Sequence, residues 1–218
     1  MAYLYLSYKE RVYVERGAMG AMSLGFSIGA GLGGEGVVKA AKRRVFGGET
    51  LLFSEFTAEY EGAWVAVSPA FPGDIEVIEV DEAHPLLVET GSLLAYSQGV
   101  HGDVRFTGLK TMVMHEGVAL IELAGNGQAV LSSYGGIERF VLGEGDEIIV
   151  DTGHIVAFSE TVEFNVGPLS SVTHAVTTGE GFVASMTGPG IVYIQTRAEQ
   201  ALRSWLFPEN DQNPPRNR

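Results

Sequence analysis

Apolar and polar residues alternate with a period of two in several short stretches of this chain, a pattern typical of strands with one buried face. The clearest stretches are residues 11–15, 75–80 and 146–151. Clusters of Gly, Pro, Asn and Asp separate such stretches and predict tight turns. They occupy residues 72–74, 125–127, 143–146 and 188–190. The pattern therefore predicts an all-β fold.

The sequence also repeats itself. Residues 14–23, 88–97 and 150–159 align without gaps and share Val, an acidic residue, Gly, Ala and Ser at the same five positions. Further strands recur around these blocks, at residues 3–7, 75–80 and 137–142 before them and at 64–68, 129–133 and 191–196 after them. Because a repeat fixes how the other elements are assigned, we predict one β domain over residues 1–197 made of three internal repeats, about 1–68, 69–133 and 134–197.

Three copies of one unit in a chain predict a double-layered β sandwich or barrel with pseudo-three-fold symmetry, the units packing around a shared centre. The repeated glycines, Gly17, Gly91 and Gly153, directly follow a predicted strand in each unit. We expect them to adopt the left-handed backbone conformation that glycine tolerates best.

Two segments depart from the strand pattern. Residues 37–46 follow a glycine-rich run and place apolar residues at helical spacing opposite a basic face, which predicts a short inserted helix in the first repeat. Residues 198–207 predict a short amphipathic helix with Leu202, Trp205 and Leu206 on its apolar side. The rest of 198–218 is polar and contains proline, so we expect a disordered tail.

Composition narrows the function. The 218 residues are 45% hydrophobic and 19% charged and include no cysteine, which excludes disulfides, thiolate metal ligands and a cysteine nucleophile. The formal charge of −13 opposes binding to nucleic acid. The first residues do not form a secretory signal, and no apolar stretch is long enough to span a membrane, so we expect a cytoplasmic protein.

Several ordered motifs together resemble a known family, the Aim-twenty-four (mitochondrial biogenesis) family, formerly a domain of unknown function. The motifs are ERGAM at 15–19, the glycine run and basic helix leading to GGE at 47–49, PAFPGDI at 69–75, SYGGIE at 133–138, VDTGHIVAF at 150–158, GPG at 188–190 and QTR at 195–197. The resemblance implies a fold similar to the tryptophan RNA-binding attenuation protein, here in three copies, and no catalytic residues. The binding residues of that protein have no match in this chain.

Candidate sites are few. The basic residues Lys39, Lys42, Arg43 and Arg44 form a patch that would suit an anionic lipid surface or an acidic protein, but four charges without a second anchoring signal favour a solvated helix face. If the repeats surround an axis, Glu49, Glu116 and Glu180, which open equivalent apolar runs, would form a carboxylate ring able to hold a cation. The alternative is that each marks an exposed strand start.

Other motifs give weaker signals. Residues 29–34 have the form G-x-G-x-x-G, but the antiparallel surroundings lack the βαβ unit of a dinucleotide site and favour a surface insertion. The five histidines, His84, His101, His115, His154 and His174, are too widely spaced for a recognisable metal motif. His154 stands where the other repeats have Ala18 and Ser92, and so breaks the symmetry.

Repeated positions hold Gly, Ala and Val, which set backbone shape and packing and carry no acid–base chemistry. We therefore expect a non-enzymatic, self-associating scaffold or binding protein without a cofactor. Its expected partner is itself, with a peripheral membrane or another protein as a further expectation. A small-molecule or carbohydrate-binding β protein is the alternative, followed by an enzyme with an unrecognised pocket.

Overall fold

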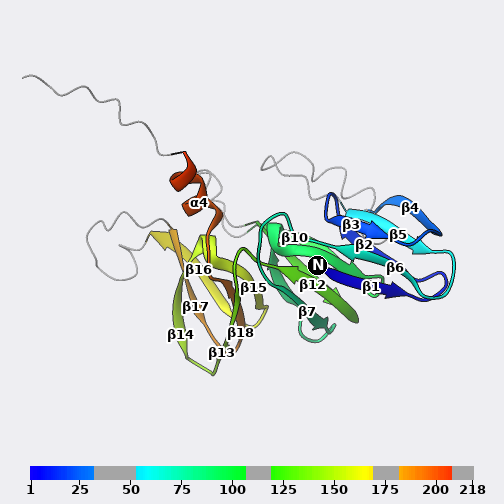
Figure 1. Cartoon of the computed structure of the whole chain (residues 1–218). Helices are drawn as coiled ribbons and strands as arrows, with labels where there is room; N and C mark the ends of the chain where they lie inside the picture. Colours follow the sequence, from blue (N-terminus) through cyan, green and yellow to red (C-terminus); the bar gives the residue numbers. More distant parts are fainter. Residues whose placement is uncertain (32–52, 107–118, 169–181, 208–218) are drawn as a thin grey trace, which may run out of the picture.

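A computed structural model describes residues 1–31, 53–106, 119–168 and 182–207 (Figure 1). The expected inserted helix at 37–46 lies outside them. The first part of the chain contains β1 (Ala2–Leu6), β2 (Arg11–Glu15), β3 (Met19–Met22), β4 (Phe26–Gly31), β5 (Phe53–Ala58) and β6 (Ala63–Val67).

Six more strands follow in each of the next two parts of the chain. The second part contains β7 (Ile75–Val80), β8 (Leu86–Glu89), β9 (Leu93–Ser97), β10 (Val100–Phe106), β11 (Ala119–Gly125) and β12 (Gly127–Ser132). The third contains β13 (Ile137–Leu142), β14 (Glu147–Asp151), β15 (Ile155–Ser159), β16 (Glu163–Pro168), β17 (Phe182–Thr187) and β18 (Gly190–Gln195). The predicted all-β fold is confirmed, and the strands predicted at 11–15, 75–80 and 137–142 have the predicted bounds.

The strands pair in the same order in these three parts, which we call unit one, unit two and unit three. In each unit the first, sixth and third strands form one antiparallel ribbon, as in β1-β6-β3, and the fourth, fifth and second form another, as in β4-β5-β2. Neighbouring units share sheets. Pairing of β2 with β9 joins ribbons of units one and two into a six-stranded sheet, and pairing of β8 with β15 does the same for units two and three.

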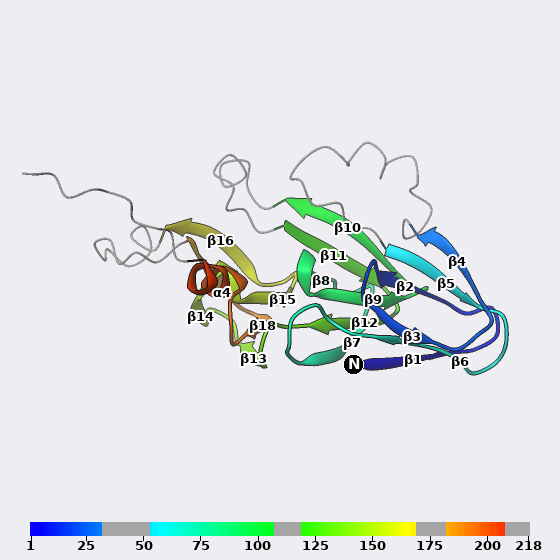
Figure 2. The ribbon, with the colours of Figure 1, turned by 45° about the horizontal axis from the view of Figure 1, so that its top comes forward.

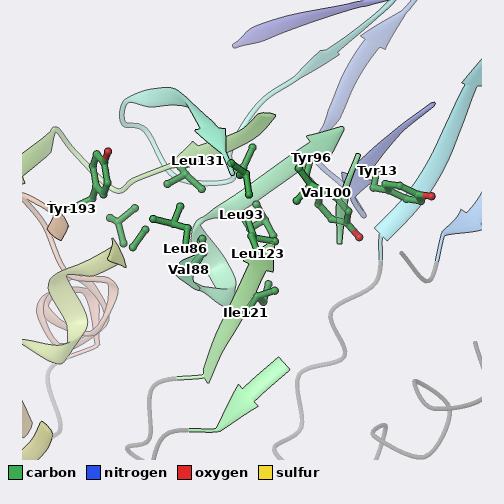
Figure 3. Close-up of a cluster of buried hydrophobic side chains, with 14 of the residues drawn as sticks. Tyr13, Leu86, Val88, Leu93, Tyr96, Val100, Ile121, Leu123, Leu131 and Tyr193 are labelled. Carbon is green, nitrogen blue, oxygen red and sulfur yellow. The ribbon is translucent and has the colours of Figure 1, made fainter. Parts of the chain in front are cut away.

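The core continues across these shared sheets. One cluster of buried apolar side chains centres on unit two, with Val88, Leu93 and Leu131 fully covered. It also takes Tyr13 from unit one and Tyr193 from unit three, and Figure 3 shows the labelled side chains as a row from Tyr193 to Tyr13. Two further clusters centre on units one and three and likewise include side chains of unit two. Each junction therefore buries the apolar surface of both units that it joins.

The segments that connect successive units contact each other. Gly73 and Gly135 form an isolated parallel bridge, and the backbone N–H of Asp74 donates to the carbonyl of Gly135 at 2.9 Å. Phe71 packs on Tyr134 with ring centroids 5.2 Å apart. The PAFPGDI and SYGGIE motifs thus meet in one structural joint between the units.

The strand pairing does not close on itself. Among the described strands, β3 pairs only with β6 and β14 only with β17, so each is an edge strand of the described sheets. They lie at opposite ends of the molecule in Figures 1 and 2. The pairing of the described strands therefore does not give the expected packing of three units around one centre. Each junction joins the second strand of one unit to the third strand of the next, which produces an open row.

The repeated glycines are equivalent in place but not in conformation. Gly17 has a φ of +94°, as expected. The prediction is wrong for Gly91 and Gly153, which lie in the 3-10 helices η1 (Thr90–Ser92) and η2 (Thr152–His154). In both, the acidic residue two positions earlier accepts a hydrogen bond from the glycine N–H, at 2.8 Å, and this cap selects the helical turn.

The predicted C-terminal helix is present as α4 (Glu199–Leu206). Its apolar side is not buried as an amphipathic helix would suggest, because only Leu202 is partly covered. Trp205 is 75% exposed. No helix in the described ranges is both long enough and apolar enough to cross a bilayer.

Candidate interaction edges

The first edge is β3, which has the apolar sequence Met-Gly-Ala-Met. All four of its residues are exposed, and Met19 and Met22 keep 41% and 37% of their surface accessible. The equivalent strands in units two and three, β9 and β15, are buried over their first four residues because a neighbouring unit pairs with them. β3 is therefore the copy of this strand that lacks its neighbour.

The second edge is β14, at the other end of the row. Ile149 is 45% exposed, whereas its counterpart in unit one, Tyr13, is 5% exposed and packs into unit two. Beside β14 lies a groove of about 410 Å³ between the two ribbons of unit three. Its lining is mostly apolar: Phe140, Ile148, Ile149, Val150, Ile194, Asp151 and His154. Unit three thus presents an open apolar surface where units one and two are covered.

The two internal junctions use one register. At the first, Tyr13 lies opposite Tyr96 and Val14 opposite Ala95. At the second, Leu87 lies opposite Phe158 and Val88 opposite Ala157, which are the corresponding positions. Tyr13 and Tyr96 also stack, with ring centroids 5.0 Å apart. Aromatic and β-branched pairs of this kind stabilise a cross-strand contact.

His154, which breaks the sequence symmetry, has a structural role. Its Nδ1 lies 2.6 Å from the carbonyl oxygen of Gln195, so Nδ1 carries the proton and donates. The Gln195 side chain in turn donates to the carbonyl of Gly153 at 2.9 Å and accepts from the N–H of Tyr134 at 2.8 Å. These bonds fasten η2 to the end of β18 and hold the His154 ring at the wall of the groove.

Glu15 carries the strongest carboxylate perturbation among the described residues. Burial at the first junction, followed by the negative charge of Glu89, raises the pKa of Glu15 from 4.5 to about 7. Tyr13 and Tyr96 have their pKa values raised chiefly by burial at the same junction. The pairing of units one and two thus brings Glu15 and Glu89, the acidic residues at the repeated position, near each other.

Replacing Glu15 by glutamine is expected to remove a pH dependence of stability. A raised carboxyl pKa means that the native state binds more protons than the unfolded state between pH 4.5 and about 7, so the free energy of unfolding falls as pH rises through that window. Solvent screening of this half-exposed group limits the loss to roughly 1–2 kcal/mol. Glu15→Gln should therefore equal wild type near pH 4 and melt about 2–8 °C higher near pH 8.

Chemical or thermal unfolding across this pH range measures the effect. Glu138→Gln, which removes one exposed carboxylate from β13, is the control for net charge. A Glu15→Gln variant whose stability tracks wild type at every pH would show that Glu15 titrates normally in the folded protein.

The residues proposed from the sequence fall mostly outside the described ranges. Glu49, Glu116 and Glu180 are among these, as are the basic residues Lys39, Lys42, Arg43 and Arg44, so the carboxylate ring and the basic patch stay predictions. Only the first residues of the G-x-G-x-x-G motif are described, at the end of β4. Within the described ranges, no group of three or more His, Asp or Glu side chains could hold a metal ion.

Sequence reasoning missed the two edges. Met19 and Met22 align with buried residues of both other units. Ile149 aligns with the buried Tyr13 and the partly buried Leu87, so the repeat alone predicts at least partial burial for all three. One feature of the sequence could have indicated the difference: Gly20 stands where the other two repeats have the bulky residues Leu94 and Val156, so β3 has less apolar volume. The open order of units, which leaves these positions uncovered, comes only from the three-dimensional pairing.

These features define an antiparallel all-β protein whose units join edge to edge. The chain belongs to the mitochondrial biogenesis AIM24 family, whose model matches residues 1–197. The resemblance drawn from the motifs is thereby confirmed. An uncharacterised protein of Streptococcus pyogenes serotype M6 is 24% identical over 192 residues, covering 85% of this chain and 76% of that protein.

The fold is also shared with a crystal structure of a Streptococcus pyogenes protein. The two superpose with a TM-score of 0.74 at 23% sequence identity, over 94% of this chain and 91% of the other. At this level of identity the similarity concerns the fold alone.

Proposed function

We propose that this protein is a non-enzymatic, self-associating scaffold built from three copies of a unit like that of the tryptophan RNA-binding attenuation protein. The observation that carries the proposal is the exposed apolar strand β3, all four residues of which are accessible while its counterparts β9 and β15 are buried. Exposed apolar edges invite further strand pairing, and natural proteins usually protect them. Association with another copy would cover this edge.

The polar side chains support a structural role. In the described ranges, no buried side-chain nitrogen or oxygen lacks a hydrogen-bond partner. His154 and Gln195 bond to backbone groups of η2 and β18 and so fasten the fold. A cytoplasmic location, the absence of nucleic acid among its partners, and a membrane or protein contact through Lys39, Lys42, Arg43 and Arg44 are parts of the same proposal.

The test of self-association is sedimentation velocity of the full chain over a concentration series. We expect species larger than the 23.3 kDa monomer, with a mean mass that rises with concentration. A protein that remains monomeric at every concentration reached would contradict the scaffold.

The groove in unit three supports a second candidate, the binding of a small, mostly apolar ligand or a sugar. Its volume, about 410 Å³, lies within the range of ligand pockets, and Asp151 and His154 supply polar groups among apolar walls. Thermal-shift screening against sugars, amino acids, nucleotides and divalent cations measures this activity, since a specific ligand raises the melting temperature by mass action. A ligand whose effect disappears on filling the groove, as in Ile194→Trp, would favour this candidate.

A further inference from the structure

We propose that copies of this chain join head to tail, with β14 of one copy pairing antiparallel with β3 of the next. The inference rests on the proposed self-association and names the surface and register that produce it. Its partner is a second copy of this chain.

The argument begins with the order of the strands. Both internal junctions join the second strand of one unit to the third strand of the following unit, as β2 joins β9 and β8 joins β15. After these two junctions, one second strand and one third strand remain at an edge, and these are β14 and β3. A third junction of the same kind can form only between two copies, because the two strands lie at opposite ends of the molecule (Figures 1 and 2).

The other edge strands do not have this property. The first and fourth strands of each unit, such as β7 and β10, are at an edge in all three units. Each of them pairs with one strand of its own unit, and among the described strands none pairs with its other edge, so these residues contain no example of a junction across that edge. The edges of β3 and β14 differ because the same edges are paired and buried elsewhere in the same molecule.

The internal junctions also fix the register. They place Val14 opposite Ala95 and Val88 opposite Ala157. The corresponding residues at the free edges are Val150 and Ala21. In the same register, Ile149 lies opposite Met22 of the next copy and Ile148 lies opposite its Ser23, as Leu86 lies opposite Ser159.

The groove completes the match. In unit two, the positions that correspond to the groove include Val88 and Leu131, which are fully buried in one cluster with Val156 and Tyr193 of unit three. In unit three these positions are Val150 and Ile194, and both line the open groove. The groove is therefore the place where β3 and β6 of the next copy would enter.

The side chains at this third junction are complementary in size. The strands that would enter the groove, β3 and β6, carry the small residues Gly20 and Ala66. The equivalent residues are larger in the other units: Leu94 and Val130 in unit two, and Val156 and Tyr193 in unit three. The receiving positions hold Phe140 and His154, where unit two has Ile78 and Ser92. The entering strands therefore carry smaller side chains, and the groove that receives them carries larger ones, as close packing of an interface requires. This accounts for the one histidine that breaks the repeat.

Such a contact is heterologous, since different surfaces of the two copies meet. It extends the row of units and gives rings where the rotation closes and filaments where it does not. A two-fold dimer through one edge, with β3 pairing to β3, would use the same strand on both copies and would end after two chains.

The experiment blocks each edge separately. Ile149→Lys places a charge on β14, and Met22→Lys places one on β3; both positions are exposed in the single chain, so folding should be retained. Each variant alone is expected to be monomeric in sedimentation velocity. An equimolar mixture should form a one-to-one dimer, because the Ile149→Lys chain still offers β3 and the Met22→Lys chain still offers β14.

Val141→Lys is the matched control, since Val141 is 66% exposed on β13 at the same end of the molecule as β14. This variant should assemble as wild type does. Circular dichroism and melting temperatures close to wild type for all three variants would confirm that the charge acts on association.

Cysteine pairs test the register directly, because the chain has no cysteine of its own. Residues opposite each other in an antiparallel pair have Cα atoms about 4.5–5.5 Å apart, within reach of a disulfide. A chain carrying Ile149→Cys and Met22→Cys should give a ladder of linked species on mild oxidation, seen on non-reducing gels. A chain carrying Val141→Cys and Met22→Cys should not.

The outcomes separate this contact from the scaffold as a whole. A wild-type protein that assembles, together with lysine variants that assemble equally well, would overturn the head-to-tail contact and leave the scaffold intact. Dimerisation of Ile149→Lys alone would indicate pairing of β3 with β3 and would also overturn it. A wild-type chain that is monomeric at all concentrations overturns both.

Discussion

Replacing Phe158 by alanine is expected to destabilise the protein by about 3–5 kcal/mol, the usual effect of deleting a buried aromatic ring. Phe158 has no exposed surface and lies on β15, where it faces Leu87 across the junction of units two and three. Its ring also stacks on Phe164, with centroids 4.9 Å apart. Removal therefore leaves a cavity in the core of unit three and weakens the sheet that units two and three share.

Chemical denaturation at fixed protein concentration measures the change in the free energy of unfolding, and thermal unfolding measures the change in melting temperature. We expect the melting temperature to fall by about 6–20 °C for a chain of this length. Phe158→Leu keeps most of the apolar volume and should recover much of the stability. Phe207→Ala removes the same ring from a position that is 76% exposed beyond α4, and its effect should stay within about 0.5 kcal/mol. Equal losses for the two alanine variants would show that Phe158 is not packed as described.

The local part of this fold could be predicted from the sequence. The period-two alternation over residues 11–15 and 75–80 predicts a strand in each stretch, and the strands form with these bounds. Such a pattern depends on residues that are neighbours along the chain. The predicted C-terminal helix, α4, follows from local spacing in the same way.

The arrangement of the units could not be predicted, because it depends on pairs of strands far apart in sequence. The alignment of β3 with β9 and β15 suggests one environment for all three. Only the pairing of β2 with β9 and of β8 with β15 shows that the row is open and that β3 is left without a second neighbour. The perturbed pKa of Glu15 escapes sequence analysis for the same reason, since both its burial and the proximity of Glu89 arise at a junction.

The motifs that carry the family resemblance acquire a physical meaning from the structure. PAFPGDI and SYGGIE are the connections between units. They bind each other through backbone hydrogen bonds, to which the side chains of Asp74 and Ser133 add further bonds. Gly73 and Gly135 allow the two backbones to approach closely. Glycine in these motifs therefore positions one unit against the next.

Replacing Gly73 by alanine is accordingly expected to disturb the joint between the units. A Cβ atom at Gly73 would overlap the carbonyl oxygen of Ser133 and lie 2.7 Å from the carbonyl oxygen of Gly135. Both are backbone atoms fixed in the joint: the N–H of Asp74 donates to the same Gly135 carbonyl, and the N–H of Gly135 donates to the carbonyl of Pro72 at 3.0 Å. Ser133 is held as well, because its N–H donates to the carbonyl of Asp74 at 3.1 Å, so neither backbone can move without breaking a bond of the joint. The steric strain is expected to lower stability by about 1–3 kcal/mol, the range found for overpacked sites.

Gly29→Ala is the matched control, because a Cβ there meets no atom within 4 Å and its φ is not positive. It should leave stability unchanged or raise it slightly, since alanine restricts the unfolded chain more than glycine does. Hydrogen exchange gives the sharper readout for Gly73→Ala. Protection should fall first at Asp74, Gly135 and Ile137, whose N–H groups bond within the joint, while the centres of β12 and β18 stay protected. Uniform loss of protection across all three units would mean that the joint has no separate stability and that the units unfold as one.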